Sequence, residues 1–128
     1  MQISVSQEQG RVPVTVLKLD GLLNMGTSEL LEKQGSEAYA AGARYLLIDM
    51  SQVSSLTSAG LRSILRISRQ FDSGMPGNGP DGQPQAGRKH ACLKLLNPNS
   101  QIENVLTIAG FTSFLEIYQD RQTAIDSF

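Results

Sequence analysis

Hydrophobic positions divide the chain into short strand-like runs and longer helix-like stripes. Residues 2–7 alternate between apolar and polar, which predicts an edge strand with one solvated face. After a hairpin turn, a second strand is expected over 12–19, and we expect Asp20 and Gly21 to close it. The run 44–50 is almost continuously apolar, which is typical of a strand covered on both faces.

Helical spacing of apolar residues predicts the two helices that flank this buried strand. The first is expected over 24–41, with Thr27 or Ser28 as its N-cap and Gly42 as the glycine that follows its C-terminus. The second is expected over 57–71, with small hydroxyl residues at its start and apolar residues along one face.

The last third of the chain continues the alternation of strands and helices. We expect a strand over 91–96, a capping turn at 97–100, a helix over 102–109, a short strand over 114–117 and a terminal helix over 120–128. The order is therefore β-β-α-β-α-β-α-β-α. Helices between the later strands imply parallel pairing, so we predict an α/β fold with a mixed sheet of about five strands and about four helices packed over it.

Length and charge limit the functions that the chain can have. A chain of 128 residues with 40% hydrophobic content suits one soluble domain, and we expect residues 1–128 to form it. Glycine and proline dominate 72–89, so we expect a mobile surface loop there, with a partner-binding lid as the alternative.

The net charge of −1 does not favour binding to nucleic acid. Without a secretory leader or an apolar run of roughly 20 residues, the expected location is the cytoplasm, with no direct membrane insertion.

No set of residues supports catalysis, a cofactor or a metal. Cys92 is the single cysteine and lies in an expected strand, where a buried thiol is inert. His90 is the single histidine, so the chain has no cluster of His and Cys that could form a structural zinc site. Ser58 has no base beside it in the sequence, and Asp49 is expected to cap a turn with Ser51. We therefore expect a non-catalytic binding module.

The strongest functional signal lies where the buried strand 44–50 gives way to the helix 57–71. Thr57 and Ser58 place hydroxyl groups where the helix begins. Free N–H groups and the helix dipole favour negative charge there. The position suits a phosphate, another anion or an acidic partner loop, although simple helix capping is the alternative.

This stretch resembles the central motif of STAS domains, the sulphate-transporter and anti-sigma-factor-antagonist family. Ile48–Ser51 matches the strand end of the motif, and Leu56–Leu61 matches its helix start. Leu19–Asn24 resembles the family's turn after the second strand, Leu93–Pro98 its later strand before a helix, and Ala109–Tyr118 its closing turn and last strand. The likeness covers nearly the whole chain outside the loop rich in glycine and proline.

The resemblance implies a cytosolic anti-sigma factor antagonist that acts in signal transduction and transcription regulation. Such a protein binds a serine-kinase-type anti-sigma factor, is phosphorylated by it and is restored by a PP2C-type phosphatase, which amounts to partner switching. The implied partner surface comprises the turn at 21–25, the turn at 51–58 and the helix 57–71. The residues expected to contact the partner are Asn24, Asp49, Ser51, Thr57, Ser58, Arg62 and Arg66.

The chain departs from the family at the phosphoacceptor. The family's acceptor is the serine directly before the glycine of Asp-Ser-Ser-Gly, and this chain has Ala59 there. Thr57 stands in place of that aspartate, and Asn24 in place of another, so the implied interface is less acidic. Two outcomes stay open. Either Ser58 or Thr57 is phosphorylated, although each lies just before the family's acceptor position, or the domain binds its partner constitutively.

Three arginines, Arg62, Arg66 and Arg69, follow at helical spacing, and no acidic residue occurs over 51–71. They form either a solvated face or a docking site for an acidic partner. No aromatic residue is interleaved with them, so nucleic acid is the poorer interpretation. A phosphate on Ser58 would lie one turn from Arg62 and would repel an acidic or apolar partner without altering the fold.

Two other classes of function stay open at this point. A constitutive STAS adaptor in a transport or lipid-handling complex would contact a membrane protein's cytosolic face without any phosphate. An enzyme that uses the turn at 49–60 as an anion pocket is the third possibility.

Overall fold

The computed structural model of the protein describes residues 2–72, 92–113 and 115–128. The loop expected over 72–89 lies outside these residues except for its first position, as does His90. The described elements, in chain order, are β1 (Gln2–Gln9), β2 (Pro13–Leu23), α1 (Met25–Ala40), β3 (Leu46–Leu56), α2 (Ser58–Asp72), β4 (Leu93–Leu96), α3 (Ser100–Ile108), the short 3-10 helix η1 (Phe111–Ser113), β5 (Glu116–Tyr118) and α4 (Arg121–Asp126).

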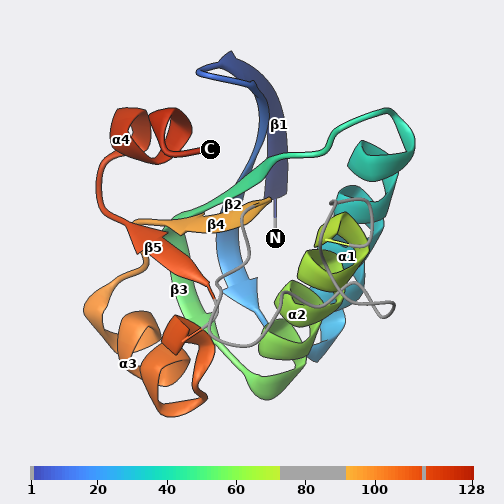
Figure 1. The fold of residues 1–128 in the computed structure, drawn as a ribbon. Coiled ribbons are helices and arrows are strands. Elements are labelled where there is room, and N and C mark those ends of the chain that lie inside the picture. The colour runs from blue at the N-terminus through green and yellow to red at the C-terminus, as the bar shows by residue number, and fades with distance from the viewer. Residues whose placement is uncertain (1, 73–91, 114) are drawn as a thin grey trace.

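The described strands form one mixed sheet in the order β1-β2-β3-β4-β5 (Figure 1). β1 and β2 pair antiparallel, and each later neighbouring pair is parallel. Crossover helices between the later strands are what parallel pairing requires. The predicted fold class and the predicted order of strands and helices are confirmed.

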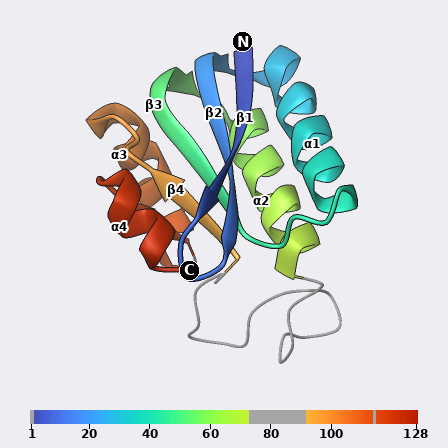
Figure 2. The same ribbon diagram turned by 90° about the horizontal axis from the view of Figure 1, so that it is seen from above.

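Helices cover both faces of the sheet. α1 and α2 lie side by side on one face, and α4 lies on the opposite face (Figure 2). α3 belongs to the layer of α1 and α2, because its Ile102 and Leu106 join their apolar cluster. β3 sends Ile48 and Met50 into that cluster and Leu47 into the smaller one under α4. The prediction that this strand is covered on both faces is therefore confirmed.

β2 and β3 are longer than predicted, and this corrects two expected turns. β2 does not close at Asp20 and Gly21 but runs to Leu23, and β3 runs to Leu56, so most of the expected turn at 51–58 is strand. The parallel ladder continues to the pair Leu23–Leu56 across two register shifts. Gly21, at φ 126°, lies beside one shift. The buried side chains of Leu23, Val53 and Leu56 stabilise the extension.

α1 is capped by a residue that differs from the prediction. Its N-cap is Asn24 rather than Thr27 or Ser28. Asn24 precedes the first helical residue, and its side chain accepts hydrogen bonds from the N–H groups of Gly26 at 3.0 Å and Thr27 at 3.2 Å. Thr27 completes a capping box, because its hydroxyl accepts the Asn24 N–H at 2.9 Å.

The elements near the C-terminus have shifted bounds. β4 begins at Leu93, and β5 spans Glu116–Tyr118 rather than 114–117, because η1 precedes it and the N–H of Leu115 donates to Phe111 at 2.8 Å. Asn99 caps α3 and Asp120 caps α4. Among the helices that the structure describes, none has the length and apolar character needed to cross a membrane.

Candidate functional site

The candidate site lies where β2 passes into α1 and β3 passes into α2. Thr57 joins the two passages, because its N–H donates to the carbonyl of Leu23 at 3.0 Å. The Thr57 carbonyl accepts the N–H of Leu61 at 3.0 Å, which is the first hydrogen bond of α2. Both Thr57 and Ser58 are exposed. The helix thus begins at Ser58 with two accessible hydroxyl residues, as the sequence predicts.

The Thr57 side chain does not cap α2. Its hydroxyl donates to the Leu23 carbonyl at 3.4 Å, which turns it toward the end of β2. The N–H groups of Ser58, Ala59 and Gly60 precede the first helical hydrogen bond, so they are the donors that a capping group or an anion would meet. The start of α2 therefore keeps its attraction for negative charge.

Gly60 lets α2 approach the two strand ends closely. A Cβ added there would lie 2.7 Å from side-chain carbons of both Leu23 and Leu56. Contacts that short are not tolerated without movement of the neighbours. The glycine of the motif therefore fixes how α2 sits on β2 and β3, and with it the position of Ser58.

Asp49 and Ser51 do not belong to the surface around Ser58. Asp49 is 6% exposed, and its carboxylate accepts the N–H of Ser51 at 2.9 Å. This contact forms within β3, so the expected turn is absent. Both residues line a hollow of about 180 Å³ together with Asn97 and Arg121. Because Asp49 and Leu47 alternate with the residues that face α1 and α2, the hollow opens on the α4 side of the sheet.

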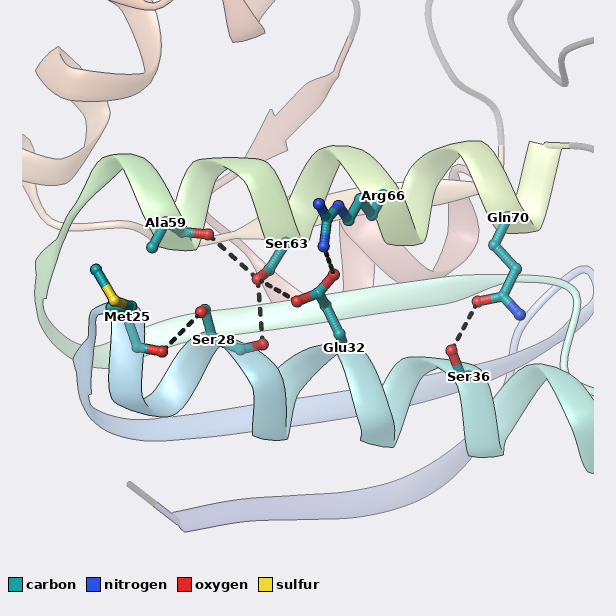
Figure 3. A network of polar contacts seen from close by, with 8 residues as sticks. All are labelled: Met25, Ser28, Glu32, Ser36, Ala59, Ser63, Arg66 and Gln70. Carbon is teal, nitrogen blue, oxygen red and sulfur yellow. Dashed lines mark hydrogen bonds and ion pairs between the residues drawn. The ribbon is translucent and has the colours of Figure 1, made fainter.

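The three arginines of α2 are not equivalent, because one of them forms an ion pair that the sequence did not predict. Arg66 contacts Glu32 of α1 at 3.0 Å, and the other Glu32 oxygen lies 3.2 Å from the Ser63 hydroxyl (Figure 3). Ser63 is buried and lies within hydrogen-bond distance of the carbonyls of Ser28 and Ala59. Arg66 therefore belongs to the α1–α2 interface.

Arg62 and Arg69 remain exposed, and no ion pair is recorded for either within the described residues. Arg62 lies one helical turn after Ser58. Arg66 also keeps 60% of its side chain exposed, but its charge is paired with Glu32, so Arg62 and Arg69 are the arginines of α2 that have no acidic partner among the described residues.

Two exposed apolar residues at the same junction were not predicted. Leu22 is 49% exposed at the end of β2, and Met25 is 78% exposed at the start of α1. The Met25 side chain lies near Ala59 (Figure 3). The signal that could have found them is their position, since both fall inside the predicted turn 21–25. We name Leu22, Met25, Thr57, Ser58 and Arg62 the junction surface.

Cys92 is buried, and burial raises the pKa of its thiol to about 12. A thiol with so high a pKa carries almost no thiolate near neutral pH, so it is a poor nucleophile. The expectation of a buried cysteine is confirmed.

Comparison with known proteins finds a matching family and a similar protein. The family model described as the STAS domain matches residues 5–74. A protein of Bordetella bronchiseptica, BtrV, whose name gives its role provisionally as anti-sigma factor antagonist, is 26% identical over 110 residues, which cover 86% of this chain and 82% of BtrV.

Solved structures show the same fold at low sequence identity. An anti-sigma factor antagonist from Mycobacterium paratuberculosis superposes with a TM-score of 0.69 at 18% identity, covering 97% of this chain and 92% of that one. The anti-sigma factor antagonist SpoIIAA in its unphosphorylated form gives a TM-score of 0.65 at 19% identity, covering 98% and 96%. SpoIIAA has also been solved in a phosphorylated form, with a TM-score of 0.64 at 17% identity, covering 98% and 97%. With its family model matched from β1 through α2 and its sheet and helices arranged as in these structures, the chain belongs to the STAS domain family.

Proposed function

We propose that this protein is a non-catalytic anti-sigma factor antagonist that binds its partner through the junction surface. The observation that carries the proposal is the exposure of Thr57 and Ser58 at the first turn of α2, inside the region that the STAS model matches. Leu22 and Met25 support it, because exposed apolar side chains beside a polar rim are typical of protein interfaces. The site of action would be the cytoplasm.

The partner of this proposal is a serine-kinase-type anti-sigma factor, with a PP2C-type phosphatase that reverses its action. The names of BtrV and SpoIIAA support an anti-sigma factor as the partner, and the phosphorylated form of SpoIIAA supports control by phosphate. The exposed charge nearest the junction comes from Arg62, one helical turn after Ser58, and Arg69 adds a second charge in the last turn of α2. A partner surface with acidic groups opposite α2 would complement it.

Ser58 is the best candidate for the phosphate. Ala59, at the family's acceptor position, has no hydroxyl, and the Thr57 hydroxyl is turned to Leu23. A phosphate on Ser58 would add roughly −1.5 to −2 charge at the N-terminus of α2, one turn from Arg62. The helix would tolerate this charge, whereas an apolar or acidic partner surface would be repelled.

A constitutive adaptor is the second candidate function. It is favoured by one observation, which is that the acceptor position holds Ala59. In that case the junction surface binds its partner, in a transport or lipid-handling complex, without any covalent control.

Affinity purification with the whole protein as bait tests the proposal. We expect the wild type to retain a serine-kinase-type anti-sigma factor and Met25→Asp to lose it, whereas Ile108→Asp retains it. Met25 and Ile108 are both strongly exposed, at 78% and 86%, so neither change disturbs the core. Equal loss with both variants, or capture of no such factor, contradicts the proposed role.

Phosphopeptide mapping after incubation with the captured kinase and ATP separates the two candidates. We expect phosphate on the wild type and on Thr57→Ala but none on Ser58→Ala. Unmodified wild type in the presence of an active kinase would identify a constitutive binder.

A further inference from the structure

β1 is an edge strand of the described sheet, and its own residues provide none of the usual protection against pairing. It spans eight residues, whereas the strand at the opposite edge, β5, spans three. β1 contains no proline and no lysine, and its register with β2 is continuous from Gln2 to Gln9. Most of its residues are exposed, including Val5 at 52%. Natural sheets block such edges with proline, lysine or a bulge, because a free edge can pair with another strand.

The hairpin shows which backbone groups of β1 face outward. The N–H of Gly10 donates to the carbonyl of Val12 at 3.1 Å, just beyond the opposed residues Gln9 and Pro13. Pro13 has no N–H, so Gln9 and Pro13 form a pair that exchanges no hydrogen bonds. Bonded and non-bonded pairs alternate along an antiparallel ladder. The residues whose N–H and C=O groups point away from β2 are therefore Ile3, Val5, Gln7 and Gln9.

We infer that this edge pairs with the same edge of a second copy of the chain, antiparallel and centred on Val5. In that register the outward groups of Val5 bond to those of the partner's Val5. Ile3 of each copy pairs with the partner's Gln7. The pairing joins the two sheets into one and places one apolar side chain against another at its centre.

The charges of β1 permit this pairing. Glu8 is the only charged residue of the strand, and in this register it opposes the partner's Gln2. Its carboxylate is already held by Arg121 at 2.8 Å. Ser4 opposes the partner's Ser6. No like charges meet across the two-fold axis, so nothing in the strand discourages a symmetric pair.

Sedimentation equilibrium of the full chain over a range of concentrations tests the inference. We expect the wild type to approach twice the single-chain mass of 13.9 kDa as the concentration rises. Val5→Pro should stay at the single-chain mass, because it removes an outward N–H while every bond to β2 is kept. Val5→Thr keeps that N–H and should still dimerise.

A second variant serves if Val5→Pro fails to fold, as judged by its circular dichroism. Val5→Lys brings two ammonium groups together on the axis and should likewise abolish the dimer. A wild type that keeps the single-chain mass up to millimolar concentration overturns the inference and leaves the edge for a strand of another protein. A dimer that survives Val5→Lys or a folded Val5→Pro overturns it as well.

Oxidative cross-linking tests the register. Cys92 is buried, so Val5→Cys and Gln9→Cys each introduce a single accessible thiol. Opposed residues of a bonded pair have Cα atoms about 5.5 Å apart, which suits a disulfide. Two copies of residue 9 would lie on the order of 25 Å apart. We expect rapid cross-linking of Val5→Cys alone, and equal rates would contradict the register.

Discussion

At the scale of single residues, Gly60 sets the position of the junction surface. Its Cα faces the side chains of Leu23 and Leu56, and a Cβ would lie 2.7 Å from each. We predict that Gly60→Ala lowers the free energy of unfolding by about 1–3 kcal/mol, because α2 or the two leucines must move. Urea denaturation followed by circular dichroism measures the change.

Gly26→Ala is the matched control for this substitution. Gly26 lies in the first turn of α1, and the nearest atom to an added Cβ is 3.5 Å away, in the side chain of Asn24. Alanine should be neutral there or stabilise by up to about 1 kcal/mol through helix propensity. A loss with Gly26→Ala as large as with Gly60→Ala would show that helix start geometry, and not close packing, explains the effect.

At the scale of elements, the pair α1–α2 explains why the arginines of α2 are not equivalent. Arg66→Glu would face Glu32 beside the buried Ser63, so we predict a loss of about 1 kcal/mol in the free energy of unfolding. Arg62→Glu should change stability by less than about 0.5 kcal/mol, because Arg62 is exposed and has no acidic partner among the described residues. Thermal denaturation at low and at high salt measures both.

A charge exchange is the control for the arginine prediction. Arg66→Glu combined with Glu32→Arg should recover most of the lost stability, since the pair is rebuilt in reverse. Should the double variant be less stable than Arg66→Glu alone, Arg66 is not stabilised by Glu32. For partner binding, Arg62→Glu is the informative variant, because it changes the junction surface and leaves the α1–α2 interface unchanged.

The order of the elements could be predicted because periodicity is a local property of the sequence. Apolar alternation and helical stripes place each strand and helix, and Gly42 at φ 108° ends α1 as predicted. The ends of β2 and β3 could not be predicted, since a bulge and a neighbouring strand extend them. The pair Glu32–Arg66 was missed for the same reason: its residues are far apart in sequence and meet only when two helices pack.

At the scale of the whole molecule, the two faces of the sheet are held differently. The face under α1, α2 and α3 has a large apolar cluster, whereas α4 contributes only Ala124 and Ile125 to the smaller one. Polar contacts add to this smaller cluster in holding α4. Lys94 of β4 is 4% exposed, and its amine donates to the carbonyl of Ser127 at 2.9 Å and contacts Glu116 at 3.2 Å. The attachment of α4 thus depends on a buried cation.

We predict that Lys94→Met frees α4 before it affects the rest of the fold. Methionine keeps the length of the side chain but leaves the Ser127 carbonyl and the Glu116 carboxylate without their cation, which should cost about 1–3 kcal/mol. Hydrogen exchange followed by mass spectrometry should show faster exchange in α4, with α2 unchanged. Lys18→Met, on β2, where the side chain is exposed, is the control and should alter neither helix. Uniformly faster exchange in Lys94→Met would instead mean that α4 and the main apolar cluster unfold as one unit, and that the layer under α4 is essential to the whole domain.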